Sequence, residues 1–330
     1  MSPGRRPFTV LAVLAVLALV LTVCLAGWSA WRSVRQEQQE GSARVPGAPA
    51  PGTAEASPPT APTARPSESG EPDGNGGNGG ALRGTVVVID PGHNPGNREH
   101  TREIARRVDI GTGRKECDTT GTATDSGYAE AAFTLDVSRR ARDILAERGA
   151  RVVLTHDGDR PYGPCIDERA ARGNAVDADA AVSVHADGSG DGNRGFHVIV
   201  PARVQKGDAD TTGITGPSRL LGEELVDAFA AATGTGPAGY LGPAVAETGL
   251  VTRGDLGGLN LSRVPKVFLE CGNMRDPRDS RLVTDPSWRQ RAAEGLADGV
   301  TAFLRGSGSR PHAGTDNADP PDPAGRPSVR

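Results

Sequence analysis

The sequence is poor in aromatic residues and has no marked excess of either charge. Only three Trp, three Tyr and six Phe occur among its 330 residues, so a folded core has to be built mainly from Val, Leu, Ile and Ala. The 37 basic and 41 acidic side chains are interspersed and give a net charge of −4, which provides no basic patch for a nucleic acid. The glycines follow no Gly-X-Y period, which excludes a collagen-like rod.

Glycine and proline are abundant instead. The 45 Gly and 26 Pro make up about 22% of the chain, nearly double the average of about 12%. They concentrate in residues 41–80 and 306–330, which have little apolar surface to bury. Runs rich in Ile, Leu and Val recur between these two segments. We therefore expect one folded domain over residues 81–305, preceded by a disordered tether over 32–80 and followed by a disordered tail over 306–330.

A long apolar run lies near the amino terminus. Residues 8–31 carry no charge, and as a helix they would extend about 36 Å, enough to cross the hydrocarbon core of a membrane. Arg5 and Arg6 precede the run, which predicts a cytoplasmic stub and a single-pass anchor over residues 1–31, with the remaining chain outside the membrane. A cleaved signal peptide, and hence a secreted protein, is the alternative.

Strand and helix patterns alternate through the central part of the chain. The expected strands, rich in β-branched residues, are 84–90, 151–155, 180–184, 196–200 and 266–270. The expected helices are 129–148, 167–177, 217–233 and 286–305. This alternation predicts an α/β domain with a mostly parallel, mixed central sheet and helices on both faces. Residues 94–128 and 201–216 lack periodicity, and we expect loops or hairpins there.

Four side chains with metal-site chemistry lie where predicted elements begin or end. His93, His185 and Glu270 close three apolar strands, and Glu130 opens the first long helix. Carboxyl ends of strands meet at one edge of an open α/β sheet, so these groups are expected to converge. Each residue alone has a structural explanation, such as a hydrogen-bonded histidine or an acid at a helix start. Their joint occurrence favours a catalytic zinc site with two imidazoles and one carboxylate as ligands and the other glutamate as general base.

The segments around these residues resemble a known family. The similar segments are V-I-D-P-G-H-N-P-G-N (88–97), G-Y-A-E-A-A-F (127–133), E-R-A-A-R-G-N-A (168–175), V-S-V-H-A-D (182–187) and V-P-K-V-F-L-E-C-G-N (264–273). In this order they resemble the zinc-dependent N-acetylmuramoyl-L-alanine amidases, and in particular the compact mycobacterial-type amidases that lack a wall-binding module.

The resemblance implies a function and a role for each of the four side chains. It implies that His93, Glu130 and His185 bind Zn²⁺ and that Glu270 is catalytic. It also implies hydrolysis of the amide between N-acetylmuramic acid and L-alanine in peptidoglycan by a domain expected to be monomeric. Two alternatives stay open: a non-catalytic peptidoglycan-binding regulator on the same fold, and a zinc peptidase that cuts within the stem peptide. A serine nucleophile is disfavoured because no G-x-S-x-G occurs.

Three further expectations concern supporting residues. Asp90 is a candidate to orient a ligand imidazole, although a turn role before Pro91 explains it equally well. Cys117 and Cys165 are flanked by turn residues in an exported chain, and the resemblance supports a disulfide between them. Cys271 follows Glu270 in a core strand and is expected to be buried and unpaired.

The remaining histidines are not expected to bind the metal. His197 lies within a strand and is expected to be structural, whereas His100 and His156 fall in loops and His312 in the tail.

Overall fold

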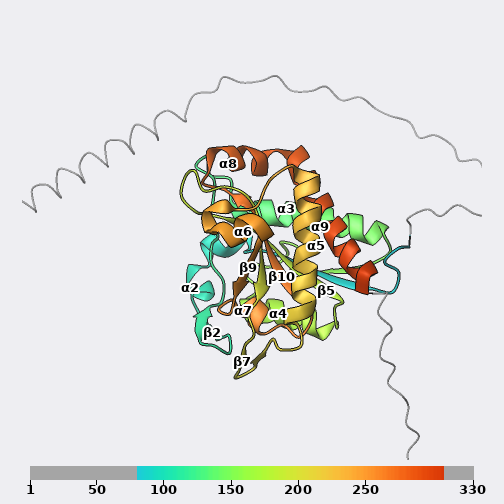
Figure 1. The fold of residues 1–330 in the computed structure, drawn as a ribbon. Helices are drawn as coiled ribbons and strands as arrows, with labels where there is room; N and C mark the ends of the chain where they lie inside the picture. The colour runs from blue at the N-terminus through green and yellow to red at the C-terminus, as the bar shows by residue number, and fades with distance from the viewer. Residues whose placement is uncertain (1–79, 308–330) are drawn as a thin grey trace, which may run out of the picture. The chain divides into compact units, whose positions relative to one another are not determined.

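The structure is a computed structural model that describes residues 80–307 (Figure 1). Its centre is a six-stranded sheet in the order β4-β1-β5-β10-β6-β9. The strands are β1 (Val86–Pro91), β4 (Arg151–Leu154), β5 (Ala180–Asp187), β6 (His197–Pro201), β9 (Leu250–Arg253) and β10 (Lys266–Asn273). All neighbouring strands run parallel except β10 and β6, which are antiparallel. The predicted α/β class with a mostly parallel, mixed sheet is confirmed.

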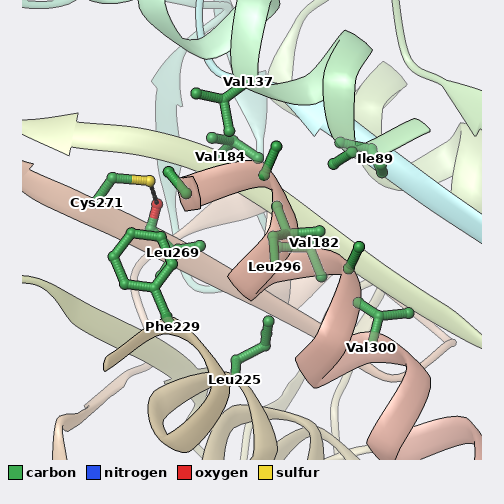
Figure 2. Packing of buried hydrophobic residues seen from close by; sticks show 14 of the residues in the cluster. Ile89, Val137, Val182, Val184, Leu225, Phe229, Leu269, Cys271, Leu296 and Val300 are labelled. Carbon is green, nitrogen blue, oxygen red and sulfur yellow. Dashed lines mark hydrogen bonds between the residues drawn. The ribbon is translucent and has the colours of Figure 1, made fainter. Parts of the chain in front are cut away.

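One face of the sheet carries the hydrophobic core. Helices α3 (Glu130–Glu147), α5 (Thr215–Thr233) and α9 (Pro286–Ser307) cover this face, and α5 and α9 lie side by side in Figure 1. Figure 2 shows Val182 and Leu269 of the sheet in the same cluster as Phe229 of α5 and Leu296 of α9. Burial of such side chains stabilises the fold by about 1.5–3 kcal/mol each. The aliphatic and small residues therefore supply the core that the scarce aromatic residues do not.

The opposite face of the sheet is more polar and is covered by shorter elements. Helices α4 (Ile166–Ala175) and α7 (Gly257–Asn260) pack there against each other. Side chains alternate between faces along a strand, so Val182 and Val184 of β5 enter the core while Ser183 and His185 point to this second side. The long segment between β1 and α3 and the C-terminal ends of the strands together shape a cleft on this side.

Short elements complete the described chain. They are η1 (Pro95–Glu99), α2 (Thr101–Ile104), β2 (Arg107–Asp109), β3 (Arg114–Glu116), β7 (Gln205–Lys206), β8 (Ala209–Asp210), η2 (Gly239–Leu241), α6 (Pro243–Thr248) and α8 (Pro277–Thr284). Strands β2 and β3 form one antiparallel hairpin, and β7 and β8 form another. Both segments that lacked periodicity therefore contain a hairpin, as expected.

The sequence pattern missed some elements and shortened others. Strand β9 was not predicted because its four residues contain only two apolar side chains and lie at the sheet edge. Strand β5 continues to Asp187, so His185 lies inside the strand rather than just after it.

The terminal predictions fall largely on residues that the structure does not describe. Within residues 80–307, no helix is long and apolar enough to cross a membrane. The expected anchor over 1–31, the tether before residue 80 and the tail beyond residue 307 lie outside the described part.

Candidate metal centre

His93 stands on a tight turn directly after β1. Its backbone is left-handed, with a φ of 62°, a conformation that is uncommon for residues other than glycine. The amide of Gly92 donates to the Val184 carbonyl at 2.9 Å, which ties the turn to strand β5. A side chain at position 92 would collide with the His185 ring, so glycine lets the two strands bring their histidines together.

Glu130 is the first residue of α3 and is held by backbone amides. Its Oε2 accepts from the amide of Thr122 at 2.9 Å, and its Oε1 accepts from the amide of Ala186 at 3.2 Å. Gly121 leaves room for this carboxylate, since a Cβ there would lie 2.8 Å from Glu130 Oε2 and 2.7 Å from the His93 ring. The carboxylate therefore has a fixed orientation toward the two histidines.

The structure brings His93, Glu130 and His185 into one cluster. One ligand atom from each lies within 4.8 Å of the others. His93 Nε2 is 3.2 Å from Glu130 Oε2, and His185 Nδ1 is 3.0 Å from Glu130 Oε1. A tetrahedral zinc with bonds of about 2.1 Å separates its ligands by about 3.4 Å. The donor types and their spacing therefore fit a zinc ion.

The electrostatics of the cluster favour positive charge between these side chains. Burial opposes ionisation of Glu130, but the charges and hydrogen bonds of His93 and His185 hold the pKa of this carboxyl well below its usual range. Burial also disfavours a charged imidazole, yet Glu130 and Asp118 raise the pKa of His93 to about 10. A site that stabilises a cation this strongly is suited to a metal ion.

Glu270 lies in the same cleft without belonging to the donor cluster. It pairs with His185 across the parallel strands β10 and β5 and faces the same side of the sheet. Burial and the carboxylates of Glu130 and Asp187 raise the pKa of Glu270 well above its ordinary value. The Tyr240 hydroxyl donates to the carboxylate of Asp187, and this hydrogen bond holds Asp187 beside the cleft.

Two adjoining cavities flank the cluster, each of about 490 Å³. Both are lined by His93 and His185, and both share Phe268, which stacks on the His185 ring at 5.2 Å. One contains Glu270 and the other extends beneath the β2–β3 hairpin. A substrate can therefore extend in both directions from the cluster.

The structure corrects the expectation for Asp90. Its buried carboxylate accepts from the hydroxyls of Thr155 and Ser183 and pairs with Arg169 at 2.6 Å and Lys266 at 3.5 Å, and none of these partners is an imidazole. Burial opposes its ionisation, but these two cations hold the pKa of Asp90 far below its usual range. Asp90 belongs to strand β1 beneath the turn, so it anchors the sheet rather than a ligand ring.

Asp118 and Thr119 occupy the position that Asp90 was expected to take. His93 Nδ1 lies 3.3 Å from Asp118 Oδ1 and 3.1 Å from the Thr119 carbonyl. Sequence reasoning missed both residues because the segment that carries them has no periodic pattern. A signal was available in Cys117, which directly precedes Asp118 and was expected to form a disulfide with Cys165.

The cysteines are arranged as expected. A disulfide joins Cys117, directly after the β2–β3 hairpin, to Cys165, directly before α4. Cys271 is free and buried.

The other histidines within the described residues lie outside the donor cluster. His197 is buried and is the first residue of β6. His156 is also buried rather than in an open loop, and its Nε2 lies 3.0 Å from the Pro91 carbonyl at the base of the His93 turn.

Two histidines and two glutamates that line one cleft of an α/β sheet offer the donor types that metal-dependent hydrolases use. Residues 87–302, about two thirds of the chain, match the N-acetylmuramoyl-L-alanine amidase family, and the chain belongs to this family. It is therefore an enzyme of the class that acts on peptidoglycan.

Individual relatives agree with this assignment. The chain is 40% identical over 232 residues to the N-acetylmuramoyl-L-alanine amidase Rv3717 of Mycobacterium tuberculosis. This match covers 69% of this chain and 89% of the relative. The amidase Ami1 of Mycobacterium smegmatis is 40% identical, with a TM-score of 0.62 over 69% of this chain and 99% of that structure. The apo form of Ami1 from Mycobacterium abscessus is 39% identical, with a TM-score of 0.61 over 68% of this chain and all of that structure. The likeness to the compact mycobacterial-type amidases is confirmed.

Proposed function

We propose that this enzyme is a zinc-dependent amidase that cleaves the bond between N-acetylmuramic acid and the L-alanine of the stem peptide. His93, Glu130 and His185 would hold the ion, and Glu270 would act as general base. The observation that carries the proposal is the convergence of two imidazoles and one carboxylate within 4.8 Å, with a further carboxylate in the same cleft.

The chain's own residues account for the proton transfers of such a hydrolysis. When bound, zinc supplies a Lewis acid that polarises a carbonyl and acidifies water. Glu270 would accept a proton from the attacking water, which adds to the amide carbon. The carbon–nitrogen bond then breaks, and Glu270 would return the proton to the amine of L-alanine. Burial and the nearby carboxylates raise the pKa of Glu270, which favours this role because a carboxyl with a raised pKa accepts a proton more readily than an ordinary one.

The proposed placement in the cell follows from the substrate and the amino terminus. Peptidoglycan lies outside the cytoplasm, and the apolar run over residues 8–31 would hold the enzyme at the membrane with its domain on that side. The Pro-rich and Gly-rich tether over 32–80 would let the domain reach wall polymer at variable distance. The size of the mature protein, by mass spectrometry, separates a retained anchor from a cleaved signal.

Digestion of a purified muropeptide, followed by mass analysis of the products, tests the proposed reaction. We expect free stem peptide beginning with L-alanine, loss of this product after a chelator, and its return with Zn²⁺. His93→Ala and His185→Ala should lose both bound zinc and hydrolysis. Cleavage within the stem would indicate a peptidase, and binding without cleavage would indicate a regulator.

A further inference from the structure

We propose that Asp118 and Arg169 are positioning residues that fix the ring and the backbone of His93 for metal binding. This inference rests on the proposed zinc site and goes beyond its donor set. Neither residue belongs to the donor cluster, and both are buried, at 6% and 5% exposed. Their partners lie on both sides of the His93 turn.

The first step of the argument concerns the two nitrogens of the His93 ring. Nε2 faces Glu130 and the donor cluster, whereas Nδ1 faces Asp118 and Thr119. A neutral imidazole carries one proton, and a metal requires the lone pair of the nitrogen that it meets. The carboxylate of Asp118 and the carbonyl of Thr119 only accept hydrogen bonds, and the Thr119 hydroxyl, 3.2 Å from Nδ1, can accept one as well. They therefore hold the proton on Nδ1 and leave the lone pair of Nε2 directed at the cluster.

The second step concerns how Asp118 itself is held. Arg169 donates to Asp118 Oδ2 at 2.9 Å, which leaves Oδ1 for the His93 ring. A guanidinium has five N–H groups, and all five of this one are used. Their acceptors are the side chains of Asp90 and Asp118 and the carbonyls of Pro91, His93 and Pro164.

The third step concerns the left-handed backbone of His93. Such a conformation is unfavourable for a side chain with a Cβ and persists only where its surroundings enforce it. Arg169 donates to the Pro91 carbonyl at 2.6 Å and to the His93 carbonyl at 3.0 Å, so it grips the turn on both sides. A single buried arginine thus couples the conformation of the turn to the carboxylate that orients the ring.

Zinc affinity of purified Asp118→Asn, measured by competition with a chromophoric chelator, tests the first two steps. Loss of one outer partner of a metal-bound histidine typically lowers metal affinity about 10-fold to 100-fold, and we expect a loss in this range. The matched control is Asp136→Asn. Asp136 also pairs with arginines, Arg140 and Arg289, but it lies on α3 outside the cluster, so zinc affinity should not change.

Arg169→Lys tests the third step. A lysine keeps the positive charge but cannot supply the five directed hydrogen bonds. We expect weaker zinc binding and a changed visible absorption spectrum of the Co²⁺-substituted protein, because the His93 ring would be displaced. Arg289→Lys is the control, since Arg289 likewise joins a carboxylate and two backbone carbonyls, and its spectrum should match the wild type. If Arg169→Lys does not fold, Asp118→Asn decides the matter alone.

The outcomes separate this inference from the proposed function. If wild-type protein binds no zinc, the proposed function fails. If wild-type protein binds zinc and Asp118→Asn binds it equally tightly, with the same Co²⁺ spectrum, the positioning role is refuted while the zinc site stands. A loss of affinity in Asp118→Asn without loss in Asp136→Asn supports the role.

Discussion

Replacing Glu270 with glutamine should abolish hydrolysis and leave zinc in place. The side chain lies in the cleft but outside the donor cluster, so its removal takes away no ligand. A general base contributes about 10²-fold to 10⁴-fold to a rate, which corresponds to about 3–5 kcal/mol of activation free energy. The matched control is Glu130→Gln, which alters a donor and should lose zinc as well as activity.

The same substitution should not weaken the fold. Burial and the nearby carboxylates of Glu130 and Asp187 raise the pKa of Glu270, so the folded protein holds this proton more tightly than the unfolded chain does. Stability from this group is therefore present at low pH and is lost as the pH rises above the ordinary carboxyl range. The glutamine amide stays neutral at every pH and avoids that loss of stability. Without metal at pH 7, Glu270→Gln should therefore unfold at the same temperature as wild type or at a higher one.

Three measurements decide this prediction: muropeptide turnover by product mass, zinc content of the purified protein, and thermal unfolding after chelation. Wild-type turnover by Glu270→Gln would refute the role of Glu270 as base. Loss of zinc equal to that of Glu130→Gln would instead place Glu270 among the ligands.

Three other predictions address stability and the shape of the site. Replacing both Cys117 and Cys165 with serine removes a cross-link between residues 48 positions apart and should lower the free energy of unfolding by about 4 kcal/mol. Urea titration measures this change, and an unchanged midpoint would contradict the prediction. Burial lowers the pKa of His197 to about 4, so the unfolded chain takes up this proton at a higher pH than the folded protein does. As the pH falls from 7 to 4, wild type should therefore lose about 3 kcal/mol more stability than His197→Leu loses. Equal losses in both proteins would contradict this. Gly92→Ala should weaken zinc binding because its Cβ would collide with the His185 ring, whereas Gly113→Ala, with open space around it, should bind zinc like wild type.

Asp90 and Asp118 show that separation in the sequence does not predict which carboxylate contacts the His93 ring. Asp90 lies three residues before His93, and this short separation made it a candidate to orient a ligand ring. The strand directs its carboxylate toward Arg169 and Lys266 instead, because β1 is still extended at that residue and the chain turns only afterwards. Asp118 is 25 residues from His93 and still reaches its ring, because the β2–β3 hairpin and the disulfide return the chain to the crevice.

The sequence by itself predicted most of the sheet strands, the long helices and the donor types of the candidate site. Apolar runs and helical periodicity predicted the α/β class because they reflect which side chains each element buries locally. The two histidines and two glutamates were found because ligands in such sheets stand where strands end and helices begin. Only the tertiary structure decided that β6 runs antiparallel to β10, that β9 closes the edge, and that Asp118 and Arg169 hold His93. These features depend on contacts between segments far apart in the chain, and no local pattern of hydrophobicity specifies which distant side chains will meet.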